Sequence, residues 1–127
     1  MIVFANTTPI IALSSIHQID LLPTLFHEIY VVDAVIEECA AGGKIVVPDL
    51  TQLPWIRTVK SEPCEDNYLL MELDQGEKHT LNMASQMNAD YVIIDEKLGR
   101  NVAEYMGLSV TGTLEGVSKG SLSPRSC

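Results

Sequence analysis

The sequence predicts a single α/β domain: a three-layer α/β/α sandwich around a central, mostly parallel sheet. Short apolar strand-like runs alternate with helical segments, a pattern typical of parallel strands joined by right-handed helical crossovers. Two runs, residues 2–5 and 91–94, are continuously apolar, as expected of central strands that helices cover on both faces. With 127 residues, 46% of them hydrophobic, the chain has the length and composition of one globular domain.

The expected elements follow the chain in alternating order. Strands are predicted at 2–5, 28–32, 55–60, 91–94 and 108–110. Helices are predicted at 8–15, 19–26, 34–41, 66–72, 75–88 and 96–106. Thr8 and Pro9 have the residue types favoured at the N-cap and first position of a helix. We expect the domain to span residues 1–117, because residues 118–127 are rich in Ser, contain Gly and Pro, and are typical of a frayed tail.

Charge and cysteine content restrict the function classes. Eight Lys and Arg against seventeen Asp and Glu give a net charge of -9, which argues against a passive nucleic-acid coat. An enzyme that meets phosphates through a metal remains compatible with this charge, as does a basic protein partner. Cys39, Cys64 and Cys127 lack a CxxC spacing, and no run reaches membrane-spanning length. These features predict a cytoplasmic protein that does not engage the membrane.

Two polar residues directly follow the most core-like strands. In an open α/β sheet, the residue after the carboxyl end of a strand is where ligands bind and where a catalytic acid would sit. Asn6 holds this position after the first strand, either as an altered acid or as an ordinary loop residue. Asp95 holds it after 91–94, where an N-cap of the following helix is the simpler alternative.

Two further acids open predicted helices. Asp74 and Glu77 have the spacing of a capping box, but Glu77 also heads the stripe of Leu81 and Ala84, where a carboxylate would be partly desolvated. Glu37 and Glu38 lie one turn into their helix, where a solvated acidic pair is favourable. If one of the two faces inward, its position beside the apolar stripe favours Glu38.

The joint placement of these residues points to a metal site. Asn6, Glu38, Glu77 and Asp95 would bring hard oxygen ligands to one edge of the sheet, as Mg²⁺ or Mn²⁺ requires. Lys97 and Arg100, in the turn after Asp95, are explained by a solvated helix face but are also well placed for a phosphate backbone.

Four segments of the sequence resemble, in order, the blocks of a prokaryotic subgroup of the PIN-domain family. They are "ANTTPIIALSSIHQIDLLPTLF", "VVDAVIEEC", "LDQGEKHTLNMA" and "DYVIIDEKLGRNVAEYMGLSVTGTLEGV", and the likeness covers nearly all of residues 1–117. The resemblance implies a PIN-like α/β/α fold. It also implies a Mg²⁺- or Mn²⁺-dependent ribonuclease, in many members the toxin of a toxin–antitoxin pair.

The resemblance assigns roles to individual residues. The opening Asp of the family falls on Asn6, the helix Glu on Glu38 with Glu37 as the register alternative, the third acid on Glu77 and the fourth on Asp95. Thr111 and Thr113 fall where the family often has a further polar ligand or a contact to metal-bound water, and we group them with Lys97 and Arg100 as weaker candidates for nucleic-acid binding. Asn6 therefore resembles a replaced metal ligand that keeps a carbonyl oxygen but removes one negative charge.

Two functions follow from this pattern. The first is a metal-dependent endoribonuclease whose cation is held by Asp95, Glu77, Glu38 and Asn6, with RNA as substrate and an antitoxin as partner. The alternative, favoured by Asn6, is a degenerate PIN module that binds RNA or a protein without cleavage. Members of the subgroup continue into a further helix where this chain has the short tail "SLSPRSC", so we expect the cover over that sheet edge to be either missing or supplied by another subunit. The habit of the family and a bare edge favour a homodimer.

Overall fold

A five-stranded parallel sheet forms the centre of the protein in the computed structural model, which describes residues 1–41, 43–63, 70–71 and 73–113. The strand order is β3-β2-β1-β4-β5, and every neighbouring pair is parallel. The strands are β1 (Val3–Ala5), β2 (Ile29–Val32), β3 (Ile56–Val59), β4 (Tyr91–Ile93) and β5 (Val110–Thr111).

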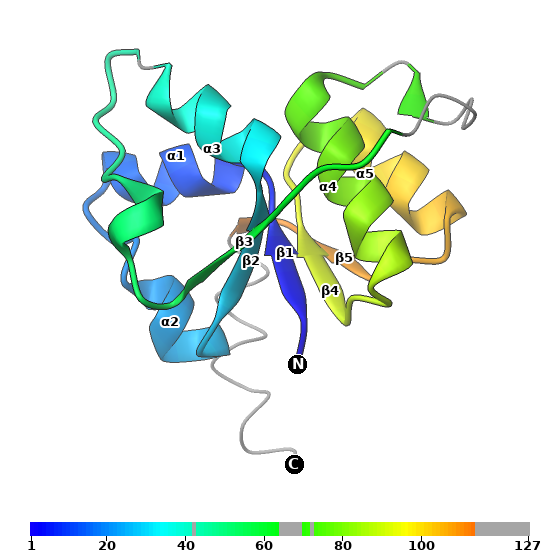
Figure 1. The fold of residues 1–127 in the computed structure, drawn as a ribbon, viewed down its shortest axis with the longest axis horizontal. Helices are drawn as coiled ribbons and strands as arrows, with labels where there is room; N and C mark the ends of the chain where they lie inside the picture. The colour runs from blue at the N-terminus through cyan, green and yellow to red at the C-terminus, as the bar shows by residue number, and fades with distance from the viewer. Residues whose placement is uncertain (42, 64–69, 72, 114–127) are drawn as a thin grey trace.

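Helices cover both faces of this sheet. They are α1 (Thr7–Ser15), α2 (Leu21–Phe26), α3 (Asp33–Ala40), α4 (Gln75–Gln86) and α5 (Lys97–Tyr105), with a 3-10 helix, η1 (Leu50–Gln52), before β3. Figure 1 shows α1, α2 and α3 on one side of the sheet and α4 and α5 on the other. This arrangement confirms the predicted α/β/α sandwich with its parallel sheet.

The two continuously apolar runs form neighbouring strands in the interior of the sheet. Every residue of β1 is fully buried, and β1 pairs with β4 through the register Ala5 to Ile93. The Asn6 backbone N–H continues this ladder by donating to the Ile93 carbonyl at 3.0 Å. Because the strands are parallel, the residues that follow β1, β2 and β4 all emerge at the same edge of the sheet.

Helix α1 begins earlier than the sequence predicts. Asn6 is its N-cap and Thr7 its first residue, so the predicted cap at Thr8 and first position at Pro9 were wrong. Pro9 is the third helical residue, where its missing N–H leaves no bond unmade, because the first N–H groups of a helix have no partner within the helix. Pro9 is therefore compatible with a helix that starts at Thr7 as well as with one that starts at Pro9. The structure has the earlier start, directly after Asn6, whose N–H still pairs with β4.

Helix α3 follows β2 without an intervening loop, and its first residue is Asp33. The Asp33 Oδ1 accepts from the Ala34 N–H at 2.8 Å, from the Ser61 N–H at 3.2 Å and from the Ser61 hydroxyl. Burial alone would raise the pKa of Asp33, but these hydrogen bonds outweigh it and lower the pKa. Asp33 therefore serves as a structural tether between α3 and the segment after β3, and it is the first residue of α3, whose N-cap is Val32.

The predicted helix at 66–72 lies almost entirely outside the described residues, as do Cys64, Cys127, the boundary at 117 and the tail 118–127. Among the described helices, none combines the length and apolar character that a membrane crossing needs. A cytoplasmic location stays a prediction.

Candidate metal centre

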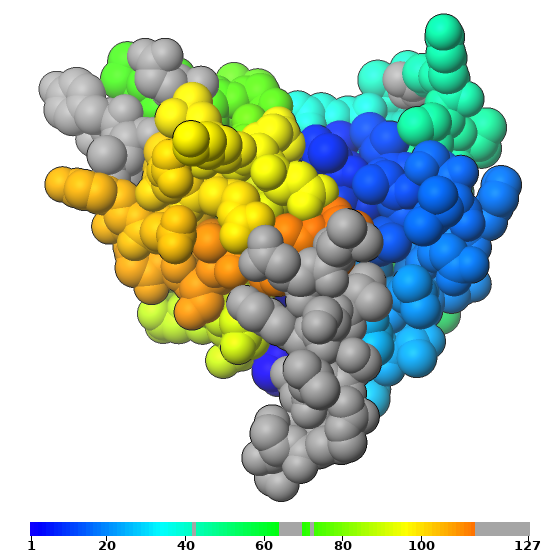
Figure 2. All heavy atoms as spheres, turned by 180° about the vertical axis from the view of Figure 1, so that it is seen from behind, coloured from blue at the N-terminus to red at the C-terminus, as the bar shows by residue number. Residues whose placement is uncertain are grey.

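Polar side chains, most of them acidic, collect at the carboxyl edge of the sheet from four segments. They come from the start of α1, from α3 after β2, from the start of α4, and from the loop between β4 and α5. Figure 2 shows the start of α5 (yellow) lying against α1 (dark blue) on this side of the molecule. Segments far apart in the sequence therefore meet at one place.

Glu38 connects three of these segments. Its Oε1 accepts from the Thr7 hydroxyl of α1 at 2.5 Å, and its Oε2 accepts from the Gly76 N–H of α4 at 3.1 Å. A Cβ at Gly76 would lie 2.2 Å from the Glu38 Oε1, so a glycine is needed for this approach. Glu37 is exposed, whereas Glu38 is half-buried and faces the other helices, as its position on the helix predicts.

Glu77 is the buried carboxylate of the site, with 6% of its surface exposed. It lies in the first turn of α4, where its backbone N–H donates to the Asp74 side chain at 2.9 Å. A Cβ at Gly99 would lie 2.6 Å from the Glu77 Oε2, so the carboxylate packs directly against the backbone of α5. Burial, and then the negative charges of Asp74 and Glu96, raise the pKa of Glu77 to about 7.

Asp74, Glu77 and Glu96 form the tightest acidic cluster found among the described residues. Each offers a carboxylate oxygen, and these atoms all lie within 4.8 Å of one another. A cation that binds oxygen ligands at about 2.0–2.6 Å would draw these atoms slightly closer together to contact all three. Glu96 is held from α1, because its Oε1 accepts from the Thr8 hydroxyl at 2.7 Å.

Asp95 lies beside this cluster and is held by a different partner. Its Oδ1 accepts from the Thr113 N–H at 2.7 Å, and its Oδ2 accepts from the Thr113 hydroxyl at 2.5 Å. The N-cap of α5 is Glu96, so the alternative that Asp95 caps this helix was wrong. Asp95 instead joins the end of β4 to the residues that follow β5.

Asn6 brings a buried oxygen to the same edge. Its residue surface is 2% exposed, and its Oδ1 has no hydrogen-bond partner among the described residues. Although Asn6 is the N-cap of α1, its side chain makes no capping bond, partly because the third helical residue is Pro9. Buried amide oxygens nearly always have a partner, so an orphaned one beside carboxylates fits a cation ligand.

The other predicted residues lie around this centre. Lys97 is exposed at the start of α5 and Arg100 is half-buried one turn further on. Thr111 is 1% exposed, and its hydroxyl donates only a long 3.4 Å bond to the Gly112 carbonyl. Their predicted contacts to nucleic acid stay predictions.

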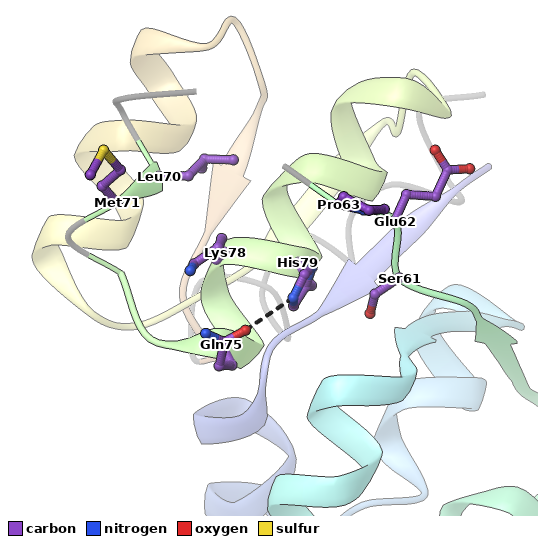
Figure 3. Close-up of a pocket in the computed structure, with 8 residues that line it drawn as sticks. All are labelled: Ser61, Glu62, Pro63, Leu70, Met71, Gln75, Lys78 and His79. Atoms are coloured by element: carbon purple, nitrogen blue, oxygen red, sulfur yellow. Dashed lines mark hydrogen bonds between the residues drawn. The ribbon is translucent and has the colours of Figure 1, made fainter. Parts of the chain in front are cut away.

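One hollow borders the site, and a second lies on another face of α4. Asp95 and Arg100 line one of about 430 Å³ whose remaining wall includes apolar residues of α1. Lys78 and His79 line another of about 580 Å³ on a different face of α4, and Figure 3 shows the His79 ring bonded to the Gln75 side chain. Neighbouring residues of a helix point in different directions, so the second hollow is separate from the side of α4 that carries Glu77.

Sequence reasoning missed several residues of the centre. Asp74 had a sufficient local explanation as the first residue of a capping box, and Thr8 as a helix cap. Thr7 and Glu96 were not singled out as candidates. The signal that could have found Glu96 was its place beside Asp95 at the end of a central strand.

The fold and this acidic edge define an α/β domain with a metal-type site. A family model, DUF3368, described as a PIN domain, matches residues 1–119, and the chain belongs to this PIN-domain family. PIN domains are generally nucleases and typically use divalent metals. No curated protein matches the chain.

A solved structure agrees with the fold. A PilT N-terminus domain protein from the hyperthermophilic archaeon Sulfolobus solfataricus P2 superposes with a TM-score of 0.69. The match covers 94% of this chain and 93% of that chain, at 15% sequence identity. At this identity the similarity establishes the shared architecture, and the function has to be argued from the site.

Proposed function

We propose that this protein is a metal-dependent endoribonuclease of the PIN type that hydrolyses RNA phosphodiester bonds with Mg²⁺ or Mn²⁺. The observation that carries this proposal is the convergence of Asp74, Glu77 and Glu96 within 4.8 Å around a buried carboxylate. Membership of a family whose domains are generally nucleases supports it.

The residues present fit a hard divalent cation. Every candidate ligand is a carboxylate or amide oxygen, the donor type that Mg²⁺ and Mn²⁺ prefer. Without a cation, the carboxylates repel one another and Glu77 is desolvated, as the raised pKa of Glu77 shows. A cation would relieve both penalties and would give the orphaned Asn6 oxygen a partner.

When bound, a divalent cation would supply an activated water for in-line attack and positive charge to stabilise the phosphate. The side chains of this protein would bind and position that cation. Glu77 and Glu96 would be ligands, and Glu38 fixes the first turn of α4 by accepting a hydrogen bond from the Gly76 N–H. Asp95 faces the hollow it shares with Arg100, whose apolar wall suits a nucleobase or sugar beside the acidic edge.

A catalytically degenerate module that binds RNA or a protein without cleavage is the second candidate. Asn6 favours it, because the resemblance to the family places an acid at this position. The net charge of -9 suits a basic protein such as an antitoxin in either case. We also propose that the protein forms a homodimer and acts as the toxin of a toxin–antitoxin pair. Measuring the molecular mass in solution, with and without a co-expressed partner, would test both.

Cleavage assays separate the two functions. Single-stranded RNA is incubated with wild type, Asn6→Asp and Asn6→Asp/Asp95→Asn, each with Mn²⁺, with Mg²⁺ and with chelator. An endoribonuclease cleaves only with metal, gains rate in Asn6→Asp, and loses it when Asp95→Asn is added. RNA binding with no cleavage by either wild type or Asn6→Asp would contradict the enzyme and support the module.

A further inference from the structure

Asn6 places an uncharged side chain at the acidic edge of the sheet, where the central strand β1 ends. The Asn6 side chain is buried, makes no capping bond to α1, and has an oxygen without a donor among the described residues. Its neighbours on α1 both donate to carboxylates, Thr7 to Glu38 and Thr8 to Glu96. The Asn6 residue thus lies where α1 meets the acidic side chains.

Of the three clustered acids, Glu96 is the one with a hydrogen bond to a side chain of α1 among the described residues. It follows β4, the strand that pairs with β1, and its Oε1 is held by Thr8, two residues after Asn6. Its carboxylate also reaches within 4.8 Å of the Asp74 and Glu77 ligand atoms. Glu96 therefore bridges the start of α1 and the start of α4.

We propose that Glu96 supplies the negative charge that position 6 lacks. The cation is then held by the carboxylates of Asp74, Glu77 and Glu96, with the Asn6 amide oxygen as a neutral ligand. This inference rests on the metal site of the proposed function and assigns that site's ligands in this chain.

Charge at positions 6 and 96 is interchangeable under this proposal. Removing the carboxylate from Glu96 weakens cation binding, because a neutral amide attracts a divalent cation much less than a carboxylate does. Placing a carboxylate at position 6 in the same variant restores the lost charge. No such compensation is expected if Glu96 only caps α5.

The test is Mn²⁺ binding to metal-free protein, measured by calorimetric titration and by the shift in melting temperature. The variants are Glu96→Gln, Asn6→Asp/Glu96→Gln, Thr8→Val, and Glu104→Gln as a control on the exposed face of the same helix. We expect Glu96→Gln to weaken Mn²⁺ binding about tenfold or more, and the double variant to return to within about threefold of wild type. Thr8→Val, which removes only the hydroxyl that holds Glu96, should weaken binding by a smaller factor, and Glu104→Gln should leave it unchanged.

Each other outcome overturns something specific. If wild type binds Mn²⁺ and Glu96→Gln binds it equally, the role of Glu96 is wrong while the metal site stands. If Glu96→Gln binds weakly but the double variant is not restored, the two positions do not share one cation and the proposed ligand set is wrong. If neither wild type nor Asn6→Asp responds to millimolar Mn²⁺, the metal dependence of the proposed function fails together with this inference.

Discussion

Two glycines allow buried carboxylates to sit between packed helices. Gly76 admits Glu38, and Gly99 admits Glu77, each at a distance that a Cβ would occupy. Neither glycine needs a positive φ, since the structure assigns positive φ only to Gly43 and Gly107 among the described glycines. Gly76 and Gly99 are therefore required because a Cβ at either position would overlap with a carboxylate.

Gly99→Ala should displace the Glu77 carboxylate, because the new Cβ would lie 2.6 Å from its Oε2 and 2.5 Å from the Ile94 Cδ1. We expect a loss of about 1–3 kcal/mol in the free energy of unfolding, together with weaker Mn²⁺ binding. Chemical denaturation and calorimetric titration measure the two effects.

Gly107→Ala is the matched control for this substitution. Gly107 has φ +85° and nothing within 4 Å of an added Cβ, so alanine there strains the backbone without touching the site. It should lower stability and leave Mn²⁺ binding unchanged. Equal Mn²⁺ affinity in Gly99→Ala and wild type would contradict the contact-based role of Gly99.

Glu77 should make the metal-free protein less stable as the pH rises. Its folded pKa is raised from 4.5 to about 7, so the folded state holds a proton that the unfolded state has lost between these values. The stabilising contribution of protonated Glu77 is complete below pH 4.5 and is lost as the pH rises through about 7.

Glu77→Gln removes this ionisation while keeping the side-chain shape. In chelator, we expect the variant to be more stable than wild type at pH 8, by on the order of 1–2 kcal/mol, and similar to wild type near pH 4.5. Melting curves across this pH range measure the difference. The same variant should lose its response to Mn²⁺, and an unchanged pH dependence would show that Glu77 is not desolvated.

At the scale of elements, hydrophobic periodicity predicted whether a segment forms a helix or a strand, but it did not predict which neighbouring elements the ends of that segment contact. The central strands at 2–5 and 91–94 were recognisable because continuous apolar runs need cover on both faces. The start of α1 was misplaced by the Thr8 and Pro9 signal, because β1 pairing through the Asn6 N–H fixes the helix start one residue earlier than Thr8.

The inward direction of Glu77 was predictable from its apolar stripe. Its contact with Gly99 was not, because that contact depends on how α4 and α5 pack. Asp74 was undetected because a capping role explains it within its own helix, and Glu96 because its neighbour Asp95 was the acid expected at the end of β4. Only the packing of α1, α4 and α5 brings Asp74, Glu77 and Glu96 within reach of one cation.

The Asp95–Thr113 pair ties the last described residue to the end of β4. Thr113→Val keeps the backbone N–H bond and removes the hydroxyl bond, so we expect a loss of about 1 kcal/mol in the free energy of unfolding. Amide hydrogen exchange should speed up at residues 110–113, because β5 is a two-residue strand at the edge of the sheet and β4 is its one partner among the described strands.

Thr51→Val is the matched control, since the Thr51 hydroxyl also donates to an aspartate, Asp49, but in the distant helix η1. Its effect on exchange should stay near residues 49–52. Unchanged exchange after β4 in Thr113→Val would show that pairing with β4 alone holds β5 in place.

For the whole molecule, the net charge of -9 sets how it can meet RNA. Phosphates are repelled by an acidic surface, and the affinity of an RNA-binding protein normally comes from Lys and Arg that release counterions. Only eight such residues are present in the chain. A cation at the carboxyl edge of the sheet would reverse the local charge where the phosphate has to approach.

RNA binding by this protein should therefore require the metal. With Asp95→Asn as a slow-cleaving form, we expect labelled single-stranded RNA to bind in Mg²⁺ or Mn²⁺ and to bind at least about tenfold more weakly in chelator at the same ionic strength, a difference of about 1.4 kcal/mol. Fluorescence anisotropy measures both affinities, and K⁺ at matched ionic strength controls for general screening. Equal affinity in chelator and in metal would mean that a surface other than the acidic edge holds the RNA, which would favour the non-cleaving module over the enzyme.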